Sequence, residues 1–145
     1  MTAVAELAVG ASRTTVLVEN LTRTRIVQYA GASGDYNPLH VDERFAREVA
    51  GYPGVFAHGM LTMGMTARAI TDWVGEERLI RFGVRFTAQV WPGNTLTAVV
   101  TVTAVDEDEI TLEVTTTNED GVVVLSGTAG CRPDAGPDPS WEAHA

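Results

Sequence analysis

HGMLTMGMTARAITDWV, residues 58–74, is the longest helix candidate in the chain and the stretch that decides the fold. Its apolar side chains point almost all the way round a helix: Met60, Leu61, Met63, Met65, Ala67, Ala69, Ile70, Trp73 and Val74. Such a helix is too apolar to lie on a protein surface, and it is too short and mixed to span a membrane. We therefore expect it inside the domain, wrapped by other elements.

The second half of the chain has the pattern of an antiparallel sheet. In residues 81–90 an apolar set alternates with polar residues: Phe82, Val84, Phe86, Ala88 and Val90. Alternating segments follow at 96–102, 110–114 and 122–131, and turn sequences such as Trp91-Pro-Gly-Asn94 separate them. This spacing predicts a four-stranded meander, with a further strand near residues 14–19 at its edge.

Together these elements predict an α+β domain in which an antiparallel sheet wraps around a central helix, the arrangement of the hot-dog fold. The 145 residues suit one domain, which we place at 1–132. Shorter helices are expected at 22–32, capped by Thr22, and at 42–50, ended by Gly51. The Pro-, Asp- and Ala-rich residues 133–145 are expected to form a disordered tail. The open sheet edge predicts at least a dimer.

Composition excludes several classes of function. The net charge is −9 and all ten basic residues are arginine, which argues against nucleic acid or an anionic membrane as a partner. A phosphorylated substrate is compatible with this charge, because a few arginines can cluster locally. The single Cys131 excludes an intramolecular disulfide. The first residues lack the basic segment of a signal peptide, so we expect a cytoplasmic location.

The residues with chemical potential lie in YAGASGDYNPLHVD, residues 29–42. Gly34, Asn37 and Pro38 impose an irregular path, which predicts neither strand nor helix. A bent loop of this kind brings Asp35 and His40 to one point as an acid–base pair. A structural alternative stays open, in which Asp35 and Asn37 satisfy the turn backbone and His40 caps a helix.

A second motif, Ala57-His58-Gly59-Met60, opens the central helix. The free N–H groups and positive dipole end of a helix start stabilise a developing oxyanion. Gly59 lets a substrate approach the backbone closely, because it has no side chain. The two motifs are complementary halves of one active site.

The run Ser33-Gly-Asp-Tyr-Asn-Pro-Leu-His-Val-Asp42, followed by the motif at 57–60, resembles the MaoC-like dehydratase family, which includes (R)-specific enoyl-CoA hydratases and 3-hydroxyacyl-thioester dehydratases. The resemblance covers residues 22–131 and implies a single hot dog that needs no cofactor or metal. It also implies reversible hydration of trans-2-enoyl thioesters of CoA or acyl carrier protein to (R)-3-hydroxyacyl thioesters.

The resemblance further implies a role for each motif residue. Asp35 and His40 would hold the catalytic water, Asn37 would help to orient water or substrate, and the Gly59 N–H would bind the thioester oxygen. The other polar residues of the motifs are expected to cap or brace: Ser33, His58 and Asp42.

Three alternatives remain at this point. A hot-dog thioesterase would share the fold and the thioester, and a non-catalytic chain would serve as the partner subunit of a heterodimeric dehydratase. A metal site built from His40, His58 and Asp42 matches no standard zinc spacing.

We expect the acyl chain beside the central helix, with up to one of Met60, Met63 and Met65 shaping its site. Phosphate groups of the carrier would be bound by some of the arginines in the domain, the candidates being Arg44, Arg47, Arg68, Arg81 and Arg85.

Overall fold

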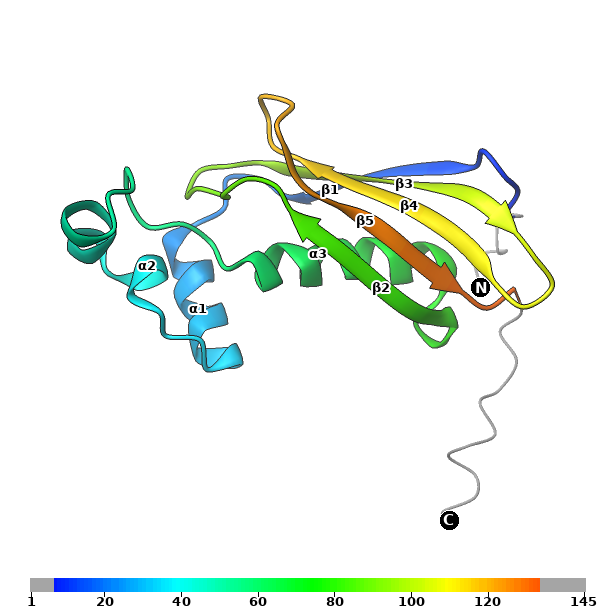
Figure 1. Ribbon diagram of the computed structural model, residues 1–145, viewed down its shortest axis with the longest axis horizontal. Coiled ribbons are helices and arrows are strands. Elements are labelled where there is room, and N and C mark those ends of the chain that lie inside the picture. Colours follow the sequence, from blue (N-terminus) through cyan, green and yellow to red (C-terminus); the bar gives the residue numbers. More distant parts are fainter. Residues whose placement is uncertain (1–6, 134–145) are drawn as a thin grey trace, which may run out of the picture.

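A five-stranded antiparallel sheet forms the larger layer of the protein (Figure 1). The computed structural model describes residues 7–133. The strands lie in the order β1-β3-β4-β5-β2, and their bounds are β1 Ser12–Val18, β2 Leu79–Phe86, β3 Leu96–Val105, β4 Ile110–Thr117 and β5 Val123–Cys131. The predicted α+β class is confirmed, and β1 occupies a sheet edge as expected; its neighbour there is β3. The predicted tail, apart from residue 133, lies outside the described residues.

Helix α3 lies along one face of the sheet; the helical elements that precede it in the chain gather at the end where it begins, and a short 3₁₀ helix follows its other end (Figure 1). These elements are α1 Arg23–Ser33, α2 Pro38–Val41, the π-helix η1 Phe45–Val49, α3 Gly59–Val74 and the 3₁₀ helix η2 Glu76–Arg78. The predicted cap of α1 is confirmed, because Thr22 Oγ1 accepts a hydrogen bond from Arg25 N at 3.2 Å.

The core lies between α3 and the sheet, in two clusters. Near the C-terminal end of α3, Ile70 and Val74 pack with buried side chains of β3, β4 and β5. Near its start, Leu61 packs with Leu96 and Leu125. Only this inward face is buried, and Met60 on the other side is 56% exposed. The predicted packing of the sheet on a central helix is confirmed, and within the single chain the sheet covers one face of that helix.

The predicted meander is wrong at its first step. Strand β2 pairs with β5, not with β3, and forms the edge opposite β1. It ends at Phe86, so residues 87–90 are not strand. The segment between β2 and β3 instead bonds to other parts of the chain, since Ala57 N donates to Val90 O and Leu21 N donates to Asn94 O. This connection therefore crosses the end of the sheet from β2 to β3. A tight hairpin would instead have joined two neighbouring strands.

The segment before α3 also differs from its prediction. Residues 38–41 form a short helix where we expected irregular chain, because Pro38 occupies its first turn and Asn37 caps it. The predicted helix at 42–50 is a π-helix over Phe45–Val49. Asp42 does cap this segment, since its Oδ1 accepts from Phe45 N at 3.1 Å. Gly51 follows it with φ of 77°.

Two further features bear on the excluded classes of function. Within residues 7–133, no helix has the length and apolar character needed to cross a membrane. Cys131 is a buried free thiol at the end of β5. Burial raises the pKa of this thiol, the charge of Arg78 lowers it, and the charge of Glu109 raises it further. A thiol with a raised pKa holds little thiolate, so Cys131 is a poor nucleophile.

The close approach of β5 to β2 predicts opposite effects for two glycine substitutions. A Cβ at Gly127 would collide with the backbone of Gly83 and Val84, whereas one at Gly31 in α1 meets nothing within 4 Å. We expect Gly127→Ala to lower the free energy of unfolding by about 3 kcal/mol. Gly31→Ala should raise it by about 0.5–1 kcal/mol. Urea denaturation measures both, and an unchanged midpoint for Gly127→Ala would contradict this strand packing.

Candidate active site

The turn after α1 presents Asp35. The helix ends at Gly34, whose φ of 74° is left-handed and whose N–H bonds to Ala30 O. Ser33 Oγ donates to Tyr29 O at 2.7 Å and accepts from Asp35 N at 3.2 Å. Ser33 therefore braces the turn, as expected, and the Asp35 side chain stands at the surface.

The backbone next to Asp35 holds its carboxylate. Asp35 Oδ1 accepts from Asn37 N at 3.2 Å, and Asn37 Oδ1 accepts from Leu39 N at 3.0 Å. The second bond caps α2, so the Asn37 side-chain oxygen serves the fold. These two hydrogen-bonded turns lead the chain from Asp35 into α2, which contains His40. The Asp35 and Asn37 side chains therefore satisfy turn backbone, as the structural alternative proposed for them.

His40 is held by its Nδ1 atom, which lies 2.6 Å from Phe56 O. A carbonyl oxygen only accepts, so Nδ1 carries the proton of this bond. In the neutral ring Nε2 then has a free lone pair, which is the state that a base or a water-binding group requires. The ring of Phe56 packs edge-on against His40 with centroids 5.3 Å apart.

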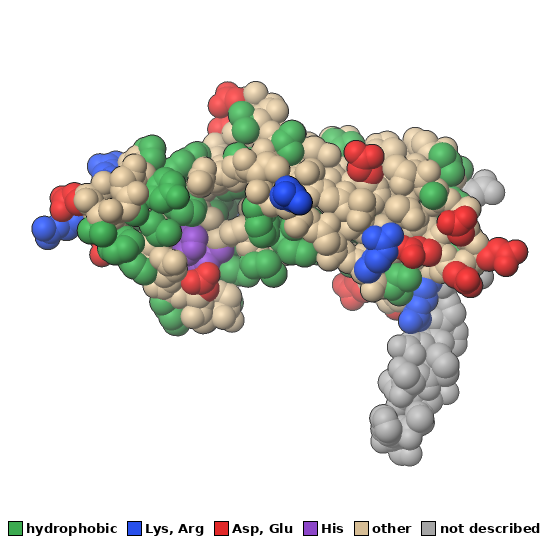
Figure 2. Space-filling model, viewed as in Figure 1, with side chains coloured by type: hydrophobic (Ala, Val, Ile, Leu, Met, Phe, Trp, Pro, Cys, Tyr) green, Lys and Arg blue, Asp and Glu red, His purple; other side chains and the backbone are tan. Residues whose placement is uncertain are grey.

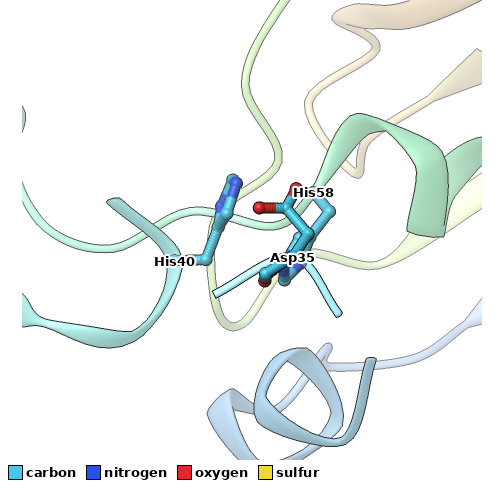
Figure 3. A group of neighbouring side chains, drawn as sticks. All are labelled: Asp35, His40 and His58. Carbon is cyan, nitrogen blue, oxygen red and sulfur yellow. Dashed lines mark hydrogen bonds between the residues drawn. The ribbon is translucent and has the colours of Figure 1, made fainter. Parts of the chain in front are cut away.

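Three side chains from two motifs meet at one point (Figure 3). The carboxylate of Asp35 and the ring of His40 face each other, and one ligand-type atom from each of Asp35, His40 and His58 lies within 4.8 Å of the others. His58 is 2% exposed, and its ring stacks on His40 with a centroid distance of 3.8 Å. Histidine side chains are visible at the surface between the helical end and the sheet (Figure 2).

A cavity of about 320 Å³ lies next to this group: Phe56, which packs against His40, lines it, and the three side chains of the group do not. Gly59 is the first residue of α3 and lines the cavity together with Thr62 of the same helix. The rest of the lining comes from Phe56, Ala57, the segment from Phe86 to Val90, and Val124. A Cβ at Gly59 would lie 3.1 Å from the ring of Phe86, so this position has no room for a side chain unless Phe86 moves.

The sequence missed most of this cavity. None of Met60, Met63 and Met65 lines it: Met60 is exposed, and the other two pack against the core. The apolar alternation at 82–90 contained Phe86 and Val90, but their place beside Gly59 depends on the crossing of residues 87–95.

Most of the arginine candidates are paired on the surface. Ion pairs join Arg44 to Glu48, Arg47 to Glu43, Arg68 to Asp72 and Arg81 to Glu109. Arg85 has no ion pair among residues 7–133 and stays the least engaged candidate for binding phosphate.

The Asp35, His40 and His58 group has the residue types of a divalent-metal site. Asp42, which the metal alternative included, instead accepts a hydrogen bond from Phe45 N and so caps the helical segment that follows it. His40 Nδ1 and His58 Nε2 are already bonded to backbone carbonyls. A metal would therefore compete for Nε2 of His40 and the Asp35 carboxylate, the two groups that acid–base chemistry would use.

The fold and this site define a hot-dog domain in which a carboxylate and an imidazole face each other beside the start of a helix that lines a cavity. The chain belongs to the MaoC-like domain family, which it matches over residues 4–123. It is 34% identical to the (R)-specific enoyl-CoA hydratase of Rhodospirillum rubrum, over 78% of this chain and 80% of that enzyme. It is 39% identical to the enoyl-CoA hydratase ChsH3 of Mycobacterium tuberculosis, over 65% of this chain but only 32% of that protein.

Solved structures agree with this assignment. The (R)-hydratase from A. caviae involved in PHA biosynthesis superposes with a TM-score of 0.77 at 27% identity, covering 87% of this chain and 96% of that one. A chain of the ChsH1-ChsH2 complex from Mycobacterium tuberculosis gives 0.76 at 26% identity, with 86% and 97% covered.

Proposed function

We propose that this protein reversibly adds water to trans-2-enoyl thioesters, forming (R)-3-hydroxyacyl thioesters. The observation that carries the proposal is the facing pair of Asp35 and His40 next to Gly59 at the cavity. The relatives named above support the reaction and the hand of the product, and both come to this chain as part of the proposal. The carrier is CoA or an acyl carrier protein.

Water is a poor nucleophile and needs a base within hydrogen-bond reach. In our mechanism a water molecule lies between the Asp35 carboxylate and Nε2 of His40. Asp35 takes one proton from it while Nε2 of His40 accepts a hydrogen bond from its other O–H, and the water oxygen bonds to the β-carbon of the enoyl group. The α-carbon then takes up a proton from Asp35, which completes the hydration. Proton transfer by such a pair contributes on the order of 10²–10⁴ in rate.

The electrons of the C=C bond move toward the thioester as the water adds, so negative charge develops on the thioester oxygen. The Gly59 N–H stands at the first turn of α3, where backbone donors lack partners inside the helix. In our proposal it binds this oxygen, and a preorganised donor of this kind is worth about 3 kcal/mol of barrier. The acyl chain then lies along the apolar lining of the cavity, near Phe86 and Val124.

Asn37 has a supporting role in this scheme. Its backbone N–H holds the Asp35 carboxylate, and its side-chain oxygen is engaged by Leu39 N. Only its amide Nδ2 remains to orient water or substrate. We propose that Asn37 acts chiefly by fixing the direction of the Asp35 carboxylate.

The experiment that tests the reaction separates hydration from hydrolysis. Purified protein is mixed with crotonyl-CoA and with longer enoyl-CoAs, and two signals are followed: loss of the conjugated enoyl absorbance and release of free thiol. We expect loss of absorbance without thiol, before and after dialysis against EDTA. Stoichiometric thiol release would establish the thioesterase instead, and loss of activity with EDTA would establish a metal requirement.

Substitutions that keep the local hydrogen bonds test the two catalytic residues. Asp35→Asn keeps an oxygen for Asn37 N, and His40→Asn keeps a donor for Phe56 O while removing Nε2. Each should lower kcat by about 10²- to 10⁴-fold with little change in melting temperature. Asp108→Asn, on the exposed turn between β3 and β4, is the matched control. A large melting shift with preserved turnover would return both residues to a structural role.

We further propose that the chain works as a homodimer that pairs through the β2 edge, with a second hot-dog chain as the alternative partner. Strand β2 is an unpaired edge, and Ile80 on it is 44% exposed. The solved ChsH1-ChsH2 complex shows that hot-dog chains also assemble in unlike pairs.

Ile80→Glu should convert the dimer to monomer in sedimentation velocity experiments, because it places a charge in the pairing edge. Val105→Glu is the control, since Val105 is 46% exposed but lies at the far end of β3. A monomeric wild type would contradict the homodimer. An inactive homodimer that gains activity with a second hot-dog chain would establish the unlike pair.

A further inference from the structure

His58 is the least accessible member of the three-residue group. It is 2% exposed, whereas Asp35 is exposed and His40 is half-buried. The ring of Tyr29 packs edge-on against the His58 ring with centroids 4.9 Å apart, whereas the His40 ring is stacked on it. A residue in this position is shielded from substrate by its neighbours, so it acts on the reaction only through them.

The one side-chain hydrogen bond that His58 makes within the described part of the chain ties it to the loop of Asp35. Its Nε2 lies 3.0 Å from Asp35 O, and because a carbonyl only accepts, Nε2 carries the proton. Nδ1 is buried and has no hydrogen-bond partner within residues 7–133. Buried polar atoms are usually satisfied. The ring is thus oriented so that Nε2 bonds to Asp35 O, and this orientation leaves Nδ1 without a partner among the described residues.

The His58 side chain does not cap the helix that it precedes. It is the N-cap residue of α3, yet its side chain makes no capping hydrogen bond. Residues at this position commonly use the side chain to satisfy a backbone N–H of the first turn. Here the side chain turns away from the helix to the Asp35 carbonyl, the Leu61 N–H bonds to the His58 carbonyl, and the Gly59 N–H has no partner among residues 7–133.

The ring of His58 fixes the plane of His40. The two rings stack with an interplanar angle of 26°, while Phe56 O holds Nδ1 of His40 from the edge. One contact on the face and one at the edge together determine where Nε2 of His40 points. His58 is at the same time covalently joined to Gly59, so one residue connects all three parts of the site.

We propose that His58 is a positioning residue, which sets the spacing of Asp35, His40 and the Gly59 amide through its Nε2–H bond and its ring stack; the inference rests on the proposed function. It touches neither water nor substrate. A displacement of catalytic groups by about 1 Å costs on the order of 10²-fold in rate, and this is the scale of effect that losing the bond should have.

Two variants separate the bond from the stack. His58→Phe keeps an aromatic face for His40 but has no donor, and His58→Gln keeps an N–H donor near the place of Nε2. We expect His58→Phe to lower kcat for crotonyl-CoA by about 10- to 100-fold with KM changed less than about threefold. His58→Gln should recover most of that loss. Equal turnover of wild type and His58→Phe would overturn the proposal, as would a loss confined to KM.

A double-substitution cycle with Asp35→Asn tests the route of the effect. Because His58→Phe keeps the ring stack on His40 and loses only the bond to the Asp35 loop, it should cost less than about twofold in the Asp35→Asn background. A full additional loss there would mean that His58 supports the fold in general. An inactive wild type would refute the proposed function, whereas an active wild type with additive effects would refute this inference alone.

An NMR measurement tests the geometry without any turnover. Long-range ¹H–¹⁵N spectra at mildly alkaline pH should show the proton of His58 on Nε2 and that of His40 on Nδ1. Either ring in the opposite tautomer would overturn the proposed arrangement. Because this measurement uses the wild-type protein, it decides the question even if His58→Phe folds poorly.

Discussion

The packing of one face of α3 against the antiparallel sheet is the constraint on which the rest of the molecule depends. Ile70 and Val74 anchor the far end of the helix among buried strand residues, and Leu61 anchors the near end. Since the helix cannot slide or rotate without exposing these side chains, its first turn is fixed in space. The Gly59 amide, the cavity and His58 are all positioned by this packing, which involves none of them as reactive groups.

The features predicted from sequence were those with a strong local cause. The apolar run at 58–74 and the two-residue alternation downstream gave the helix and the strands, and Thr22 marked the start of α1 at the correct residue. The proximity of Asp35 and His40 was also foreseeable, because Asn37 and Pro38 impose a tight path over the few residues between them. In each case a few residues that are neighbours in sequence determine the local structure.

The features that sequence reasoning missed depend on contacts between distant segments. The residues of β2 and its neighbours in sequence do not indicate that β2 pairs with β5. This pairing goes with the path of residues 87–95, which bond to distant segments, as Val90 O does to Ala57 N. The same crossing brings Phe86 to Gly59 and so creates the cavity, which is why the methionines of α3 were poor guides to it. The close approach of β5 to β2 likewise requires Gly127, whose role is visible only once both strands are placed.

The reactive groups come from parts of the chain with opposite physical character. Asp35 sits on a solvent-exposed turn held by local hydrogen bonds, and Gly59 sits on a helix held by apolar burial. Two such parts would move independently unless something joined them. The joining contacts are the bonds from His40 to Phe56 O and from His58 to Asp35 O, which run in opposite directions between the two segments. Because each bond crosses from one segment to the other, the loop cannot shift relative to the helix without breaking one of them.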